Sequence, residues 1–211
     1  MVRTFAAIRG GILFLAAIAM GTADDGTTHA VNKESTIAVG QMLPAFETTD
    51  DQGQSWKSTD HVGKKVVVLY FYPGDFTGGC TVQAQKYRDA LTKIEQLGAE
   101  VVGVSGDEVA SHQLFKETYG LQHALLSDST GQVAQLLNVP VKAGGSVKAA
   151  GPDRKPLLDA NGQRIELKRP VTLARWTLVV DRAGKIASLR SVTSAATDAE
   201  EIQKIVEGLA K

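Results

Sequence analysis

Cys80 is the only cysteine among the 211 residues, and it ends a short segment that is rich in glycine. The segment reads Pro73-Gly74-Asp75-Phe76-Thr77-Gly78-Gly79-Cys80. A sole thiol cannot form a disulfide within its own chain, so the roles open to it are packing, nucleophilic attack and redox chemistry with other molecules. The neighbouring glycines offer little apolar surface, which favours chemistry over the role of a small buried hydrophobe.

The elements expected around the thiol place it at the start of a helix. The apolar run 66–71 reads as a strand buried on both faces of a sheet, and the proline and glycines end it. Beyond Val82, apolar residues recur at helical spacing: Tyr87, Ala90, Leu91, Ile94 and Leu97. Cys80 is therefore expected in the first turn of a helix, where unpaired N–H groups and the helix dipole favour a thiolate.

Other groups must help to stabilise that anion, because a helix terminus contributes only about 0.3–1 kcal/mol. Thr77, three residues before the cysteine, can turn its hydroxyl toward the sulfur and accept a proton from a substrate. It could equally cap the helix. Gly78 and Gly79 leave their N–H groups unshielded, so we expect them to bind a small polar substrate.

The spacing Pro73-x-x-x-Thr77-x-x-Cys80 resembles the active-site signature of the peroxiredoxins, within the AhpC/TSA superfamily. The preceding Tyr70-Phe71-Tyr72 looks like the bacterioferritin-comigratory (PrxQ-type) branch. The similarity continues through residues 38–139 and 173–211, with matching stretches at Gly40–Phe46, Asp51–Gly53, Gly63-Lys64 and Arg175–Asp181.

The resemblance implies an α/β protein with a thioredoxin-like fold, an N-terminal β-hairpin extension and a central mixed sheet flanked by helices. It also implies a cofactor-free thiol-dependent peroxidase that reduces hydrogen peroxide or organic hydroperoxides through a cysteine sulfenic acid. Carried over by residue, Cys80 is the peroxidatic nucleophile, and Thr77 with the backbone of Gly79 and Cys80 holds the peroxide oxygens. Pro73 then shields the pocket, and Arg175 stabilises the thiolate and the charge that develops as the O–O bond breaks.

Two positions depart from the family pattern. Gln85 stands where many members of the branch have a second, resolving cysteine, and Gln83 replaces a frequent glutamate. The resemblance therefore implies a one-cysteine variant whose partners are a peroxide and an external thiol or dithiol reductant protein, with a homodimer as a candidate assembly. Two alternatives stay open: thiol–disulfide exchange, although Thr77 occupies the first position of a Cys-x-x-Cys motif, and a binding protein without turnover.

The N-terminus has the three-part pattern of a secretory signal. Arg3 and Arg9 precede a short apolar core at 12–20, and small residues up to Ala23 suggest a cleavage site. We therefore expect a signal peptide at 1–23, a polar tether at 24–37, and export to a periplasmic or extracellular location; an uncleaved anchor is the alternative. Residues 38–211 then form one thioredoxin-like domain.

The remaining segments alternate between strands and helices, which predicts crossovers onto a mainly parallel sheet. We expect strands at 101–104, 125–126, 175–180 and 185–189 and helices at 107–119 and 130–137, with a final helix that begins in a capping box of Thr197 and Glu200. An insertion at 140–172 carries seven basic and three acidic residues. It begins with a segment expected to be flexible and contains the hairpin signal Asn161-Gly162. It reads either as a lid or docking surface near Arg175 or as a solvated insertion.

Charge and histidine spacing argue against other functions. The chain carries 23 basic and 23 acidic residues, and removal of residues 1–23 would leave a net charge of about −2. We therefore expect no binding to nucleic acid. The four histidines are scattered without metal-ligand spacing, so no metal site is expected.

Overall fold

The structure, a computed structural model, describes residues 37–210. The predicted signal peptide and all of the predicted tether except Ile37 lie outside the described residues and stay predictions. Within the described part of the chain, no helix is long and apolar enough to cross a membrane.

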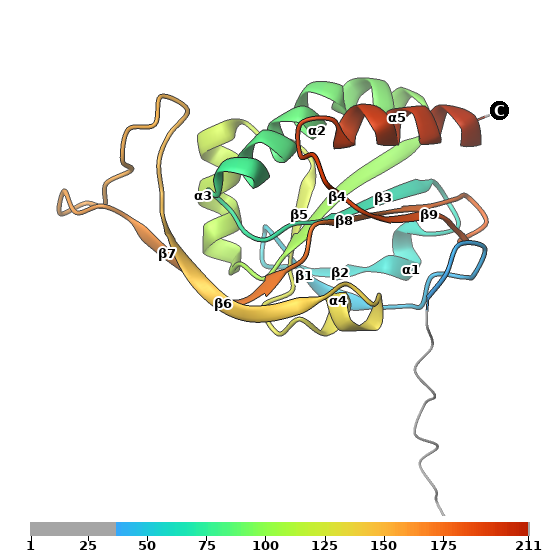
Figure 1. Ribbon diagram of the computed structural model, residues 1–211, viewed down its shortest axis with the longest axis horizontal. Helices are drawn as coiled ribbons and strands as arrows, with labels where there is room; N and C mark the ends of the chain where they lie inside the picture. The colour runs from blue at the N-terminus through green and yellow to red at the C-terminus, as the bar shows by residue number, and fades with distance from the viewer. Residues whose placement is uncertain (1–36, 211) are drawn as a thin grey trace, which may run out of the picture. The chain divides into compact units, whose positions relative to one another are not determined.

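A seven-stranded sheet forms the centre of the domain, in the order β2-β1-β5-β4-β3-β8-β9 (Figure 1). The pairs β3–β4 and β4–β5 are parallel, and all other adjacent pairs in this sheet are antiparallel. The mixed sheet implied by the family resemblance is therefore present, and the expectation of a mainly parallel sheet is wrong. The strands are β1 (Glu47–Asp50), β2 (Ser55–Lys57), β3 (Val66–Phe71), β4 (Ala99–Ser105), β5 (Ala124–Ser127), β8 (Trp176–Val180) and β9 (Ile186–Ser191).

Helices cover both faces of this sheet. They are α1 (Ser58–His61), α2 (Gly78–Gln96), α3 (Val109–Tyr119), α4 (Gln132–Leu136) and α5 (Asp198–Leu209). The two long helices α2 and α5 lie side by side on one face (Figure 1). Thr197 occupies the N-cap position of α5, but its hydroxyl donates to the Glu201 carboxylate, so the predicted capping box with Glu200 does not form.

Strand β3 is buried on both faces, as its unbroken apolar run predicts. Val66, Val68 and Tyr70 belong to a core shared with α2, α3 and α5. The alternate residues Val67, Leu69 and Phe71 belong to a second core that includes α4 and the N-terminal hairpin. Because both cores are anchored on β3, the loop that leaves its carboxyl end is held from two sides.

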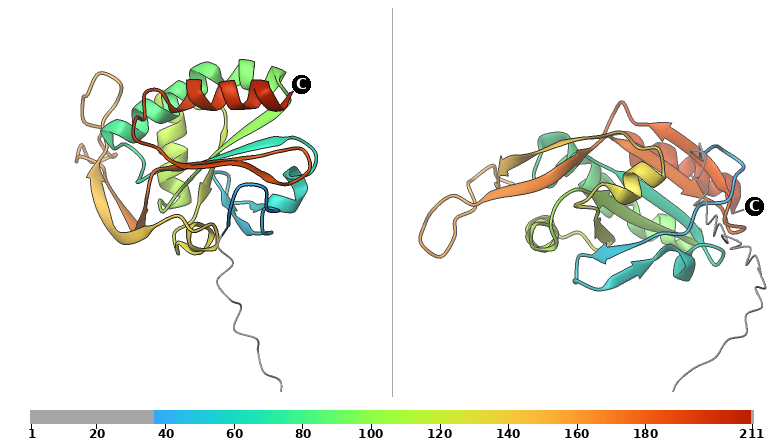
Figure 2. Two further views of the ribbon diagram at one scale, coloured as in Figure 1. Left: turned by 45° about the vertical axis from the view of Figure 1, so that its right-hand side comes forward. Right: turned by 90° about the horizontal axis from the view of Figure 1, so that it is seen from below.

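The inserted segment forms a two-stranded antiparallel ribbon, β6 (Val141–Lys148) and β7 (Glu166–Leu173), joined by residues 149–165. We call residues 141–173 the β-arm. It extends away from the seven-stranded sheet in each view (Figure 2). The flexible opening expected at 140–146 is wrong, because these residues from Val141 onward are paired in β6. The turn predicted at Asn161-Gly162 is confirmed, since Gly162 has a φ of 76° and donates to the Asp159 carbonyl.

Candidate active site

The loop after β3 brings the cysteine to the amino end of α2. Thr77 is the N-cap residue, with an extended backbone, and Cys80 is the third residue of the helix. The N–H groups of this first turn have no acceptor one turn earlier in the helix, so they face the site as free donors. The Cys80 side chain is 1% exposed, and Gly78 and Gly79 leave the outer side of the turn open.

Arg175 reaches the thiol from the neighbouring strand. It directly precedes β8, whose Trp176 pairs with Phe71 at the end of β3, and this register sets the arginine beside the loop. Its NH2 group donates a hydrogen bond to Cys80 Sγ over 3.2 Å. A Cβ atom at Gly79 would lie only 3.3 Å from the same NH2 group. Glycine at this position therefore lets the guanidinium lie against the first turn.

The second donor of Arg175 connects the thiol to the C-terminal helix. NH1 donates to the amide oxygen of Gln83, one turn after the cysteine. The Gln83 amide nitrogen in turn donates to the Asp198 carboxylate over 2.8 Å. Gln83 and Asp198 are both fully buried. The contacts thus run from the sulfur through Arg175 and Gln83 to Asp198.

Thr77 is oriented differently from the sequence-based expectation. Its hydroxyl donates to the Gly74 carbonyl over 2.9 Å instead of turning its proton toward the sulfur. Because that proton is used, the oxygen is left as an acceptor for a proton carried by a substrate. Pro73 is half-buried at the start of the same loop, between Tyr72 and Gly74.

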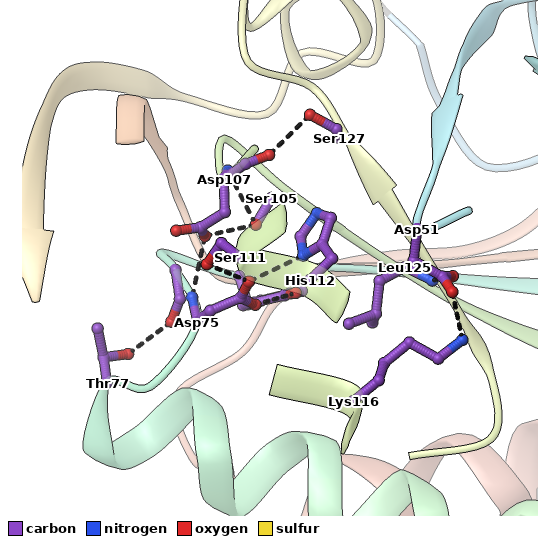
Figure 3. A network of polar contacts seen from close by, with 12 residues as sticks. Asp51, Asp75, Thr77, Ser105, Asp107, Ser111, His112, Lys116, Leu125 and Ser127 are labelled. Carbon is purple, nitrogen blue, oxygen red and sulfur yellow. Dashed lines mark hydrogen bonds and ion pairs between the residues drawn. The ribbon is translucent and has the colours of Figure 1, made fainter. Parts of the chain in front are cut away.

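A buried polar network holds the loop through Asp75 (Figure 3). Its centre is the Asp75 carboxylate, which accepts hydrogen bonds from Tyr72 at 2.8 Å, from Ser111 at 2.9 Å and from His112 Nδ1 at 2.9 Å. The Asp75 backbone N–H donates to the Asp107 carboxylate over 2.9 Å. These bonds join the loop to the residue after β3, to α3 and to the segment after β4, so the loop conformation does not depend on the helix α2 alone.

The electrostatics of this network follow from its burial. Burial, together with the charge of Asp75, raises the pKa of Asp107 from 3.8 to about 6. Burial alone would lower the pKa of His112, but the carboxylate of Asp75 outweighs it, and the pKa is raised above 6.5. The imidazolium of His112 is thus favoured by the carboxylate that it contacts.

The β-arm packs at its base against the same loops. A Cβ atom at Gly74 would lie 2.7 Å from the Arg169 guanidinium, and one at Gly106 would lie 2.2 Å from the Val171 carbonyl oxygen. A larger residue at Gly106 would therefore require a shift of the arm backbone, whereas one at Gly74 would require the Arg169 side chain to move. The side chain of Arg169 rests on the backbone of the cysteine loop, while most of the arm beyond it is exposed.

Sequence reasoning singled out six residues: Cys80, Thr77, Arg175, Pro73, Gly78 and Gly79. The structure sets Arg175 against the sulfur and beside Gly79. Thr77, Gly78 and Gly79 begin α2 together with Cys80, and Pro73 lies at the start of the loop. Sequence reasoning missed two buried groups, the Asp75 network and Asp198. The presence of an aspartate, Asp75, inside the glycine-rich loop was a local sign of a buried polar network. Ser111 and His112 for Asp75, and Gln83 and Tyr87 for Asp198, lie on other elements far along the chain, so spacing could not reveal these partners. Within residues 37–210, no group of three His, Cys, Asp or Glu side chains gathers closely enough to hold a metal ion.

A buried cysteine at a helix start, contacted by an arginine from the antiparallel neighbour of the preceding strand, defines a peroxiredoxin-type site on a thioredoxin-like fold. The AhpC/TSA family model matches residues 39–189. The chain belongs to the AhpC/TSA family, and the predicted PrxQ-type resemblance is confirmed by its relatives.

Two such relatives are 42% and 43% identical to this chain. The first is the chloroplastic Peroxiredoxin Q of Suaeda salsa, matched over 127 residues, which are 60% of this chain and 57% of that protein. The second is the putative peroxiredoxin bcp of Coxiella burnetii, matched at 43% over 105 residues, which are 50% of this chain and 69% of that protein. The chain thus spans little more than half the length of the plant relatives that it matches.

Solved structures share the fold. Peroxidoxin BcpB of Mycobacterium tuberculosis superposes with a TM-score of 0.65 at 25% identity, over 82% of this chain and 98% of that one. A PrxQ mutant of Xylella fastidiosa gives a TM-score of 0.65 at 22% identity, over 84% and 99% of the two chains. The predicted thioredoxin-like α/β class is therefore confirmed.

Proposed function

We propose that this protein is a thiol-dependent peroxidase that reduces hydrogen peroxide or an organic hydroperoxide at Cys80. The observation that carries the proposal is the 3.2 Å contact of Arg175 NH2 with the sulfur of a cysteine in the first turn of α2. The guanidinium and the free N–H groups of that turn both favour a thiolate, which is the reactive form of a cysteine.

The first step is attack of the thiolate on one peroxide oxygen. An S–O bond forms as the O–O bond breaks, the sulfur is oxidised to a sulfenic acid, and the second oxygen leaves as water or an alcohol after it gains a proton. Thr77 accepts a hydrogen bond from the peroxide proton, since its own proton is held by Gly74. Arg175 stabilises the negative charge on the departing oxygen.

Reduction of the sulfenic acid uses an external thiol. The first thiol displaces water and forms a mixed disulfide with Cys80, and a second thiol releases Cys80 and leaves as a disulfide. The chain has one cysteine, so no internal disulfide can replace this route. Because Cys80 is only 1% exposed, we infer that the first turn of α2 moves outward when the thiol attacks.

The two alternative functions receive less support. Thiol–disulfide exchange by a Cys-x-x-Cys motif needs a second thiol, and Thr77 stands at that position. A binding protein without turnover has no need of a guanidinium against a buried sulfur, and its thiol should be inert toward peroxide.

We infer further that residues 1–23 are a cleavable targeting segment that leads to export, and a homodimer is the candidate assembly of the domain. The basic and apolar pattern of the N-terminus supports the first inference. Cell fractionation with N-terminal sequencing of the mature protein tests the targeting, and light scattering of the purified domain tests the assembly.

The test of the main proposal is addition of stoichiometric hydrogen peroxide to the reduced protein. We expect rapid formation of a sulfenic acid on Cys80, detected by mass spectrometry of its dimedone adduct, and turnover when a thiol is supplied. The Cys80→Ser variant should show neither and should unfold at a temperature close to that of the wild type. A wild-type thiol that stays reduced, or turnover by the serine variant, would contradict the proposal.

A further inference from the structure

Asp198 is a fully buried carboxylate at the first residue of α5. One oxygen, Oδ2, accepts hydrogen bonds from Gln83 at 2.8 Å, Tyr87 at 2.7 Å and Thr177 at 2.9 Å. The other, Oδ1, accepts from Arg190 at 2.6 Å. Three neutral donors and one cation therefore stabilise the carboxylate. A charged group that is fully buried requires such partners.

One of these four donors leads to the catalytic thiol. The Gln83 amide has its nitrogen on Asp198 and its oxygen on Arg175 NH1. The opposite orientation would face the amide oxygen toward a carboxylate and the amide N–H groups toward a guanidinium, so it is excluded at both ends. Asp198 and Arg175 thus fix the amide orientation together, and Asp198 is the group that anchors the amide nitrogen.

The amide also keeps the charge of Asp198 away from the sulfur. The side-chain partners of Arg175 are Gln83 and Cys80, and neither brings a carboxylate into contact with the guanidinium. A carboxylate in direct contact with Arg175 would share the positive charge that favours the thiolate. An amide spacer holds the arginine by a hydrogen bond and leaves that charge for the sulfur.

We propose that Asp198 is a positioning residue for peroxide reduction, which acts by orienting the Gln83 amide so that Arg175 stays on Cys80 Sγ. The inference rests on the proposed peroxidase function. Asp198 touches neither the sulfur nor a substrate, and its effect is transmitted through two hydrogen bonds. The other titratable groups that contact it are Tyr87 of α2 and Arg190 of β9, and Arg190 also binds Glu201 of α5.

The test compares the rate at which hydrogen peroxide oxidises Cys80 in matched variants. Asp198→Asn weakens the anchor of the Gln83 amide nitrogen, so Gln83 and Arg175 can shift, and it should slow oxidation about tenfold, since small displacements of a catalytic group are costly. Thr177→Val removes another hydrogen bond to the same Oδ2 atom without touching Gln83. It should lower the unfolding temperature but keep the rate within about twofold of wild type. Equal rates for these two variants would overturn the proposal.

A double variant separates positioning from general stability. Gln83→Glu alone sets a second carboxylate against Asp198 and should slow the reaction. Adding Asp198→Asn exchanges the two functional groups. The amide at position 198 then donates to the carboxylate at position 83, and that carboxylate accepts from Arg175. The double variant should therefore react at least about threefold faster than Asp198→Asn alone, but more slowly than wild type, because its carboxylate shares the charge of Arg175. A double variant slower than both single variants would contradict the relay.

Ultraviolet titration of the Cys80 thiolate supplies a readout that does not need peroxide. Loss of the Asp198 charge would by itself favour the thiolate, whereas displacement of Arg175 disfavours it. A purely electrostatic effect of Asp198 and a displacement of Arg175 therefore predict shifts of the titration midpoint in opposite directions. We expect the midpoint of the Cys80 titration to be higher in Asp198→Asn than in the wild type. A lower midpoint would overturn the proposal. Burial raises the pKa values of Tyr70, Tyr72 and Tyr87 well above 10.0, which keeps their absorbance changes outside the titration. If wild-type Cys80 fails to react with peroxide, the peroxidase proposal fails while this titration still decides the relay.

Discussion

Arg175 and Cys80 are separated by 95 positions in the sequence, and yet NH2 of the arginine lies 3.2 Å from Sγ of the cysteine. The antiparallel pairing of β8 with β3 produces this proximity, since it sets Trp176 opposite Phe71 at the end of the strand that leads into the cysteine loop. The site is therefore complete only when the central sheet is formed.

Arg175→Lys should slow peroxide oxidation of Cys80 about tenfold, because a single ammonium cannot contact both the sulfur and Gln83 as the planar guanidinium does. Stopped-flow fluorescence measures the rate. Arg182→Lys is the matched control, since Arg182 is exposed and binds the Leu97 carbonyl at the far end of α2. Equal rates for the two variants would show that Arg175 has no part in the reaction.

Thr77→Val should also slow the peroxide step about tenfold, because the substrate loses its acceptor and the loop loses the bond to Gly74. Thr77→Ser keeps the hydroxyl and should stay within about threefold of wild type. The same stopped-flow assay compares the two variants. If the serine variant is as slow as the valine variant, the hydroxyl is not the group that matters.

His112→Gln should lower the free energy of unfolding by about 3 kcal/mol, because it takes a charged partner from the buried Asp75 carboxylate. The folded-state pKa of His112 is raised above 6.5, so its stabilisation is fully present below pH 6.5 and is lost as pH rises through that raised pKa. Urea unfolding of the variant and wild type across this range measures the difference.

The pH dependence needs a control within the same network. The pKa of Asp107 is raised from 3.8 to about 6, so its own contribution is full below pH 3.8 and declines as pH rises through about 6. The His112 comparison is therefore best made above pH 6. Ser111→Ala removes a donor that does not titrate from the same Asp75 oxygen and should give a difference that is independent of pH. A pH-independent difference for His112→Gln would contradict the charged pair.

Excess peroxide without thiol should inactivate the enzyme progressively by oxidising Cys80 to the sulfinic acid, because the chain has no second cysteine to trap the sulfenic acid. Mass spectrometry of the treated protein measures the adduct. Sustained turnover without any sulfinic or sulfonic product would refute the one-cysteine mechanism.

Gln85→Cys introduces a candidate resolving thiol on α2, where a disulfide with Cys80 requires the first turn to unwind. Protection in that variant would show that the turn opens.

The sequence by itself determined the local part of this site. The unbroken apolar run of β3, the glycine-rich loop and the helical spacing after Val82 place Cys80 at a helix start, because each depends on residues close together in the chain. The same information predicted β3, β4, β5, β8, β9 and the helices α2 to α5 to within a few residues. It gave no bounds for β1 and β2, which came only from the family resemblance, and it missed α1. It also identified Arg175, although only through the family resemblance.

The tertiary structure decided how these parts support one another. The pairing register of β8 with β3, the ordered β-arm against Gly74 and Gly106, and the carboxylates of Asp75 and Asp198 were outside the reach of the sequence. The physical reason is that buried polar groups must find partners wherever the packed elements bring them. Ser111 and His112 lie 36 and 37 positions from Asp75, and Gln83 lies 115 positions from Asp198. Local pattern sets which residues can react, and strand pairing and helix packing set which charges surround them.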